Sequence, residues 1–414
     1  MNALRALEQE VLQEGQEYTR RLLTSRLQEQ IDQIGAICPH SGLVLKEVSY
    51  RPLVLLTVVG KVRLKAAYGY SSAAGTWLTP ARVAWGMAPH QQTSPELQAR
   101  VVETAAACGS YEKAARIATL WGTPLSDDLV HAQVQGVGQR LVENPATEAP
   151  QQVKEPKFSM VIMMDGWMVR ERGKDWGKKR RRPEQCRVQW HEVKSAVIFR
   201  LEDQAATAGG RGWLIEKHVV VREPQTDPVV FGQAVQAEAM RRGLAEAQEV
   251  YLVMDGAVWL WGVREDRFKD ATPVLDFHHA SQHLWALAHH RFGDQTDEEK
   301  EQARAWVEPL LHQLRHGKEA RVIRTLENLL ATKEGRQKKV KTEVNYFKAH
   351  QDHLHYQAVD ERGGPIGSGA VESLCSQLQD RFKRTGQFWT RRGLRHLLAV
   401  EEAVRNHDFD PRCN

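Results

Sequence analysis

The order of apolar and polar residues divides the first third of the chain into three parts. Residues 1–34 carry apolar side chains at three- and four-residue spacing among many polar ones, which predicts one long helix. Between 38 and 80 the pattern changes to alternating and short apolar runs, which predicts strands joined by turns. Helical spacing returns over 94–142. The bounds that we assign to the N-terminal helix, the small β domain and the helical domain are 1–37, 38–93 and 94–144.

Within the helical domain, residues 110–138 have the outline of a helix-turn-helix. An amphipathic stretch ends at Gly122, Pro124 bars its continuation, and Ser126 offers an N-cap for the next helix. In DNA-binding proteins the second helix of such a pair enters the major groove, but any helical hairpin has the same outline. DNA binding and a plain hairpin therefore both remain open for this segment.

The rest of the chain predicts a mixed sheet that follows a linker. Residues 145–157 are rich in proline and almost free of apolar residues, which is typical of linkers. Three strands, a helix, a strand, a short helix and a last strand are predicted at 159–167, 187–200, 213–221, 228–247, 250–256, 259–269 and 273–279. This order favours a mixed sheet over a doubly wound parallel one. We assign 158–279 to the first part of this core, 280–362 to a helical insertion, and 363–414 to a helix with a basic tail.

The letters MDG occur at the ends of two predicted strands, in VIMMDG (161–166) and YLVMDG (251–256). Either copy alone is also typical of an Asp-Gly turn. In three consecutive strands followed by a crossover helix, the first and fourth strands can lie side by side in parallel, so Asp165 and Asp255 would emerge at one edge of the sheet. Two anions at close range repel, and a divalent cation such as Mg²⁺ is the simplest way to hold them.

Glu372 is the candidate for a third carboxylate at this edge. It lies near the start of the predicted C-terminal helix, where Gly367 and Gly369 are expected to permit a close approach to the sheet. A first-turn glutamate is also favoured by the helix dipole alone. Three carboxylates around paired metal ions, roughly 3.5–4 Å apart, suit phosphodiester chemistry, since one ion activates the attacking oxygen and the other stabilises the leaving oxygen.

Composition limits the class of protein. Hydrophobic residues make up 42% of the 414 residues and charged residues 26%, as in ordinary folded domains. No apolar run approaches the roughly 18 residues that span a bilayer, and the start of the chain lacks a secretory signal. The five cysteines are scattered and form no C-x-x-C motif, which predicts reduced thiols and a cytoplasmic protein.

The formal net charge of +5 is modest, but the cations are clustered. KKRRRP (178–183) and the segment 381–395 are the candidate contacts with phosphates, because neutralising phosphates releases counterions; a solvated surface is the equal alternative. Phe388 and Trp389 could stack on an unpaired base, although packing in the core is the favoured interpretation. The proposed DNA contacts are Lys178, Lys179, Arg180, Arg181, Arg182, Arg381, Lys383 and Arg384.

Asp165, Asp255 and Glu372, with a helical stretch between the last two, resemble the triad of DDE transposases, which have the RNase H-like fold. More specifically, nearly the whole chain resembles bacterial insertion-sequence transposases of the Kra type. The similar stretches are MDGWMVRERG, WHEVK, YLVMDGA, VLDFHHASQHL, IGSGAVES and the closing QDRFKRTGQFWTRRGLRHLLAVEEAVRN. The resemblance implies a multidomain α/β protein: an RNase H-like mixed sheet with a helical insertion, preceded by a small β-ribbon domain and a helical, HTH-like domain.

The resemblance also implies an activity. The triad would be catalytic and would bind Mg²⁺ or Mn²⁺, two ions in all. The substrate would be double-stranded DNA, namely the ends of the element and the target. Hydrolysis would free a 3′-hydroxyl, which would then attack the target in strand transfer. Action on two DNA ends implies a homodimer or a larger assembly on DNA, in the bacterial cytoplasm at the nucleoid and away from membranes.

Asp276 and His279 stand in the D-x-x-H arrangement that follows the second aspartate in related transposases, which implies a supporting role next to the triad. His279 and His283 are four residues apart on one predicted helix and could suggest zinc instead. No third ligand is evident in the sequence, so ordinary helix histidines are the favoured interpretation.

The small β domain departs from the related transposases, which carry a zinc-ribbon-like segment with two C-x-x-C-type pairs. Here the first pair has become CPHSG, with Cys38 kept and Ser41 in place of its partner. The second pair falls at YSSAAGTW, which contains no cysteine. Cys38 and His40 cannot complete a four-ligand zinc site, so we predict a ribbon without metal.

Two other functions remain open from the sequence. A nuclease or resolvase of the same fold would use the same carboxylates without strand transfer. A DNA-binding protein would use the helical domain, and its carboxylates would be structural only.

Overall fold

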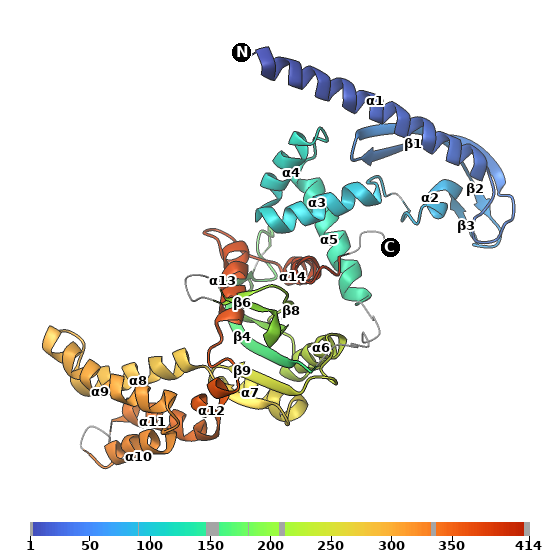
Figure 1. Cartoon of the computed structure of the whole chain (residues 1–414). Coiled ribbons are helices and arrows are strands. Elements are labelled where there is room, and N and C mark those ends of the chain that lie inside the picture. The colour runs from blue at the N-terminus through green and yellow to red at the C-terminus, as the bar shows by residue number, and fades with distance from the viewer. Residues whose placement is uncertain are drawn as a thin grey trace. The chain divides into compact units, whose positions relative to one another are not determined.

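The computed structural model describes residues 3–89, 91–145, 157–180, 182–206, 212–332 and 337–409 (Figure 1). The chain forms two compact units, residues 1–144 with 407–414 and residues 145–406. Of the predicted linker at 145–157, all but the two end residues lie outside the described residues. In the described part of the chain, no helix is long and apolar enough to cross a membrane.

In the first unit, a long helix packs on an antiparallel sheet. Helix α1 (Ala3–Ile34) is followed by strands β1 (Lys46–Thr57), β2 (Gly60–Ser71) and β3 (Thr76–Leu78), in the order β1-β2-β3. Ile31 at the end of α1 is buried with apolar residues of β1 and β2. The predicted helix and strands are confirmed, but β1 and β2 are longer than the short strands that the sequence suggested.

The predicted ribbon positions come together in this unit. Cys38 is buried, and its Sγ lies 3.6 Å from the hydroxyl oxygen of Ser71. Hydrogen bonds from the hydroxyls of Ser41 and Ser71 lower the pKa of the Cys38 thiol to about 7. Serine hydroxyls therefore surround the one cysteine that remains, and the absence of zinc stays a prediction.

Three capped helices complete the first unit. Helices α3 (Pro95–Cys108), α4 (Tyr111–Leu120) and α5 (Asp127–Glu143) each begin after a serine whose side chain accepts a backbone N–H bond. Between α4 and α5, Gly122 has a positive φ of 84°, which glycine adopts without strain. The predicted helix-turn-helix outline is confirmed within about one residue, and its binding to DNA stays a hypothesis.

The second unit is built on a five-stranded mixed sheet with the order β10-β9-β4-β5-β8. Its strands are β4 (Ser159–Arg172), β5 (Val188–Arg200), β8 (His218–Arg222), β9 (Glu249–Met254) and β10 (Thr272–Leu275). Strands β4, β5 and β8 are antiparallel, whereas β9 is parallel to both β4 and β10. The predicted mixed sheet, with its first and fourth strands side by side, is therefore confirmed.

Alternation along β4 divides its residues between two helical layers. Ile162 and Met164 are buried in one core with helices α6 (Pro228–Arg241) and α7 (Val258–Arg267). Trp167 lies an odd number of residues from both and so faces the other side of the sheet. Its ring lies 5.8 Å from that of Phe382 in helix α13 (Gly369–Phe382). Because successive side chains of a strand face opposite sides, α13 covers the face of the sheet that α6 and α7 leave open.

Three predicted boundaries in this unit are wrong. The strand expected at 213–221 is divided: β7 (Gly212–Leu214) pairs with β6 (Gln204–Ala206) in a separate sheet, and only β8 joins the main sheet. The helix expected to reach 247 ends at Arg241. The last strand, β10, ends at Leu275, and the DFHH stretch instead begins a helix.

The helical insertion follows β10. It consists of α8 (Phe277–Phe292), α9 (Asp297–Arg315), α10 (Glu319–Leu330), α11 (Lys338–Ala349) and α12 (Tyr356–Glu361). Helix α8 packs on α9 and α11, and α10 packs on α11. The predicted helical insertion is therefore confirmed, and α8 links it directly to the sheet.

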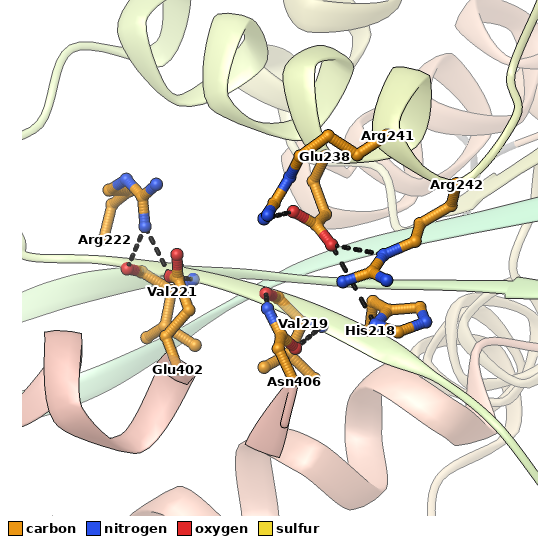
Figure 2. Close-up of polar contacts among 9 residues, drawn as sticks. All are labelled: His218, Val219, Val221, Arg222, Glu238, Arg241, Arg242, Glu402 and Asn406. Atoms are coloured by element: carbon orange, nitrogen blue, oxygen red, sulfur yellow. Dashed lines mark hydrogen bonds and ion pairs between the residues drawn. The ribbon is translucent and has the colours of Figure 1, made fainter. Parts of the chain in front are cut away.

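The outer edge of the sheet is closed by side chains of α14 (Arg391–Arg405) and the residue after it (Figure 2). Asn406 accepts a hydrogen bond from Val219 N (2.7 Å) and donates one to Val219 O (2.9 Å). Glu402 accepts from Val221 N (2.6 Å) and pairs with Arg222. These side chains take the place of a sixth strand, because an open edge would leave the backbone groups of β8 unpaired.

Candidate active site

Asp165 lies inside β4 rather than at its end. The parallel pairing of β4 with β9 stops at Met164 opposite Met254, but the antiparallel pairing with β5 continues to Arg172. The expectation of a strand end at Asp165 is therefore wrong. Asp165 is nevertheless the first residue of β4 that no longer pairs with β9, so one edge of the strand becomes free there. The last pair between the two strands is Met164 with Met254, and Asp165 and Asp255 are the residues that follow it.

The carboxylate of Asp165 is half-buried and its pKa is raised to about 6. Burial is the largest cause, and the negative charges of Asp255 and Glu372 add to it. Hydrogen bonds from Gly166 N (2.6 Å) and from the thiol of Cys375 act in the opposite direction. The two other predicted site carboxylates thus lie within electrostatic reach of Asp165.

Cys375 connects Asp165 to helix α13, one turn after Glu372. Its thiol is buried and hydrogen-bonds to Asp165 and Ser195. Burial raises the pKa of this thiol far above its usual range, so the thiol stays protonated and can donate. Ser195 in turn accepts a hydrogen bond from the indole of Trp167 (3.0 Å). This buried chain of polar contacts holds α13 against β4 and β5.

Asp255 follows β9 and forms a turn that leads into α7. Its Oδ1 accepts a hydrogen bond from Ala257 N (2.8 Å), and its carbonyl oxygen accepts one from the indole of Trp261 (2.9 Å). The aspartate side chain thereby closes an Asx turn, which ends the strand. The Asp-Gly turn that was the alternative for Asp165 is absent there, where β4 continues, and such a turn is found at Asp255 instead.

Glu372 is exposed in the first turn of α13 and is held by its own helix. Its Oε1 accepts a hydrogen bond from the hydroxyl of Ser368 (2.6 Å), the residue that precedes the helix. The expectation that glycines permit a close approach is wrong here. A Cβ at Gly369 would meet nothing within 4 Å, and one at Gly367 would be only in ordinary contact with Asp276.

Asp276 joins the second aspartate to the helix of Glu372. Its side chain is 2% exposed and accepts two backbone hydrogen bonds, from His279 N (2.7 Å) in α8 and from Ser368 N (2.6 Å) before α13. Its own N–H donates to Met254 O (2.8 Å), next to Asp255. Of the predicted supporting pair, Asp276 positions two helices, whereas His279 contributes its backbone.

The insertion contacts the turn at Asp255 through Tyr346 of α11. A Cβ added at Gly256 would lie 2.1 Å from Cε2 of Tyr346, so this ring fits against the glycine backbone. Tyr346 stacks on His283 of α8 at 3.7 Å, and His283 Nδ1 lies 2.6 Å from Glu343 Oε2. Burial raises the pKa of Tyr346 beyond its usual range, and the charge of Asp255 adds to it.

Two further histidines lie at the same turn. His350 hydrogen-bonds to the backbone of Gly256, and burial lowers its pKa. His353 stacks on Trp261 at 3.8 Å, and burial together with His350 lowers its pKa to about 4. Both rings are therefore neutral at pH 7. Sequence analysis missed these residues because no local pattern connects them with Asp255.

The donor chemistry of the three carboxylates fits a divalent cation such as Mg²⁺, which prefers oxygen ligands. In the described ranges, no lysine or arginine forms an ion pair with Asp165, Asp255 or Glu372, so their charges are not balanced by the chain. The geometry is not that of a formed site. Nowhere in the described residues are three or more His, Cys, Asp or Glu side chains arranged to hold a metal ion. This also applies to the zinc alternative at His279 and His283.

The KKRRRP run forms a loop organised around a buried aspartate. Asp175 pairs with Lys178 (2.9 Å) and with Arg182 (2.9 Å), and these cations hold the pKa of its carboxyl well below its usual range. Residues 179–180 are exposed, and Arg181 lies outside the described residues. Two of the five predicted phosphate contacts therefore hold the loop together.

Arg381, one of the predicted DNA contacts, is buried in the structure. It is only 6% exposed, and its Nε lies 3.9 Å from Oε1 of the buried Glu401 in α14. It therefore connects α13 to α14. Arg384 is exposed, and Lys383 is half-buried, so these two side chains remain accessible.

Trp389 packs within the second unit, as the favoured interpretation expected. Its indole donates to Phe382 O (2.8 Å), and the two rings lie 5.3 Å apart. Its backbone pairs with β4, since Trp389 N donates to Arg170 O (3.0 Å) and Arg172 N donates to Trp389 O (2.9 Å). The segment before α14 thus lines the free edge of β4 beyond Asp165.

Comparisons with known proteins give a family match and a similar structure. A model described as an uncharacterised protein family (UPF0236) matches residues 1–411. No curated protein matches the sequence. Among solved structures, a chain of the Drosophila P element transposase strand transfer complex is similar, with a TM-score of 0.39 and 10% identity, over 80% of this chain and 96% of that chain. The family match extends over both compact units.

Proposed function

The chain belongs to the protein family UPF0236, and from this premise we propose that it is a DNA transposase that cuts the ends of an insertion sequence and joins them to target DNA. The observation that supports this most directly is the register of β4 and β9, in which Asp165 and Asp255 follow paired residues at one edge of the sheet. Glu372 lies within electrostatic reach of Asp165. Three unbalanced carboxylates suit the binding of metal ions and phosphodiester chemistry.

In this proposal Asp165, Asp255 and Glu372 hold two Mg²⁺ or Mn²⁺ ions through their carboxylate oxygens. When bound, such ions activate an attacking oxygen and stabilise a leaving one. The other residues of the site orient the carboxylates: Cys375 donates to Asp165, and Tyr346 packs on the backbone that follows Asp255. The five-stranded sheet that contains Asp165 and precedes Asp255 is the RNase H-like core of the proposal.

The reaction has two in-line displacements at phosphorus. In the first, the oxygen of water bonds to phosphorus at the end of the element, and the 3′-oxygen leaves and takes up a proton. In the second, this 3′-hydroxyl loses its proton and bonds to a phosphorus of the target, and a target 3′-oxygen leaves and takes up a proton. The same carboxylates serve both steps, which act on double-stranded DNA at two ends and so favour a dimer or larger assembly.

The test uses the full chain with duplex DNA that carries the sequences flanking its gene. Asp255→Asn and Glu372→Gln should each reduce Mg²⁺-dependent cutting by at least about a thousandfold, because loss of metal ligands removes several kcal/mol of transition-state stabilisation. Binding to the duplex should remain. The matched control is Glu301→Gln, an exposed carboxylate in α9, which should cut like the unchanged protein.

Each other outcome identifies a different function. Cutting without joining of the freed 3′ end indicates a nuclease or resolvase. Binding without metal-dependent cutting indicates a DNA-binding protein with structural carboxylates. Full cutting by the Asp255→Asn variant would show that this aspartate is not part of the active site.

A further inference from the structure

Two tryptophans in the second unit are exposed, and cations lie over the ring of one of them, Trp190. Trp190 is 49% exposed on β5, and Trp176 is 42% exposed in the loop between β4 and β5. The guanidinium of Arg170 lies 5.5 Å from the ring centre of Trp190 and 5.2 Å from that of Phe388. Lys383 Nζ lies 5.2 Å from the ring centre of Trp190. We call Arg170, Trp176, Trp190, Lys383 and Phe388 the aromatic–cation surface.

This surface is built from three segments that the fold fixes independently. Arg170 pairs with Trp190 across β4 and β5, so both project from the same face of the hairpin. Arg170 also donates to Lys383 O (3.3 Å), which holds the segment after α13 at this place. Trp176 lies next to Asp175, whose ion pairs organise the loop, and its ring is 5.4 Å from that of Phe388. The rings are therefore held in place while remaining open to solvent.

The surface is close to the candidate active site along the same strand. Arg170 follows Asp165 by five residues of β4, or about 17 Å at the usual rise of a strand. A stacked DNA strand covers this distance with about five nucleotides. The exposed cations of the KKRRRP loop, 179–180, and Arg384 lie in two of the three segments that form the surface. Because Asp165 and Arg170 are separated by an odd number of residues, their side chains project from opposite faces of β4, so a single strand that contacts both must pass around the end of the strand.

We propose that the aromatic–cation surface binds an unpaired stretch of the DNA substrate, with bases stacking on Trp190 and Trp176. This inference rests on the proposed function and adds that part of the DNA substrate is single-stranded when it is bound. Stacking on a protein side chain needs bases that are not already paired within a duplex. On this surface the aromatic rings can stack on the bases of a single strand, and the neighbouring cations can contact its phosphates. The cations also argue against a purely apolar protein partner, which would leave Arg170 and Lys383 desolvated without a counter-charge.

The experiment measures binding of a fluorescent dT oligonucleotide of about 15 nucleotides, which spans a typical single-strand site. Fluorescence anisotropy is recorded with the full-length chain in EDTA, so that no cutting occurs. Trp190→Ala and Trp176→Ala should each weaken binding about tenfold, as expected for the loss of one stacked base. Trp190→Phe should restore most of the affinity, since a phenyl ring still stacks.

Trp213→Ala is the matched control. Trp213 is 67% exposed on β7 in the same unit and lies outside the segments that form the aromatic–cation surface, so its loss should leave affinity for the oligonucleotide unchanged. Circular dichroism and thermal unfolding check that each variant is folded. Affinity for an intact duplex should fall much less than affinity for dT in the Trp190→Ala and Trp176→Ala variants.

Three results would overturn the inference. These are unchanged dT binding in both variants, an equal loss in the Trp213→Ala control, and an equal loss for duplex and single strand. The fate of the proposed function is read separately, from cutting and joining by the unchanged protein. A protein that cuts but binds dT without these rings contradicts only this inference, and one that binds dT through them but never cuts contradicts only the transposase.

Discussion

The two MDG copies have the same letters and different structures. At Asp165–Gly166 the chain continues as a strand, because Trp167 and Val169 alternate inward and β5 pairs with the whole of β4. At Asp255–Gly256 the chain turns, because the parallel pairing ends and the aspartate side chain accepts Ala257 N. The MDG motif thus places an aspartate at both positions, while the segments that follow determine whether the backbone continues as a strand or turns.

The surroundings of the two copies differ as well. The first aspartate is held by the sheet and by Cys375 of α13. The second is held by the helical insertion, through Tyr346 and His350, and by Asp276. One carboxylate therefore depends on the sheet and the other on helices that lie up to about a hundred residues away in sequence. Substitutions in the segments that hold Asp255 should therefore disturb a different part of the site from substitutions in the segments that hold Asp165.

The largest effect on stability is expected at Asp276, which supports the segment around Asp255. Asp276→Ala removes two hydrogen bonds from buried backbone N–H groups and should lower the free energy of unfolding by about 3 kcal/mol. The matched control is Asp227→Ala, an exposed N-cap of α6 that accepts a single bond from Val229 N (2.8 Å). That change should cost only about 1 kcal/mol. Urea unfolding measures both, and equal losses would contradict the linking role of Asp276.

The glycines of the two copies give a second contrast. At Gly256 a Cβ would lie 2.1 Å from the ring of Tyr346, so Gly256→Ala should destabilise the protein by about 2 kcal/mol through overpacking. At Gly166 the nearest atom is Oε1 of Glu192 at 2.4 Å, the far end of a flexible side chain that can move away. Gly166→Ala within a strand should therefore be tolerated within about 0.5 kcal/mol. A reversed order of the two losses in thermal unfolding would show that the insertion does not hold the second aspartate.

Local signals in the sequence were sufficient for much of the architecture. Gly122, Pro124 and Ser126 fixed the turn between two helices, because each acts within a few residues. The order of three strands, a crossover helix and a fourth strand was enough to predict that β4 and β9 lie side by side in parallel. The two aspartates of the candidate site could be brought to one edge on this basis alone.

Contacts between distant segments could not be predicted in this way. Nothing near Tyr346 or His350 indicates that they pack on Gly256, because that contact depends on how the insertion folds back. Arg381 has the pattern of an exposed cation after a helix, and only the packing of α14 brings Glu401 to it. That Trp176 and Trp190 remain exposed was likewise decided by tertiary packing rather than by sequence spacing.

The third contrast concerns the first aspartate and its charge. The pKa of Asp165 is about 6 in the folded protein, above its usual value of 3.8, so the folded state holds this proton more tightly than the unfolded state. Stability should therefore fall as the pH rises from about 4 to 6 and stay lower above it. The shift corresponds to at most roughly 3 kcal/mol, which solvent screening at a half-buried group reduces to about 1–2 kcal/mol.

Asp165→Asn should remove this penalty and be more stable than the unchanged protein at pH 7, with no difference near pH 4. Asp175 is the control of opposite sign, because Lys178 and Arg182 hold the pKa of its carboxyl low. Asp175→Asn should be less stable at pH 7, and this loss should disappear as the pH falls through the pKa of the folded carboxyl. Urea unfolding at several pH values measures both variants. Two differences of the same sign at pH 7 would show that the charge of Asp165 is balanced by the chain, which would also remove the reason for it to attract a cation.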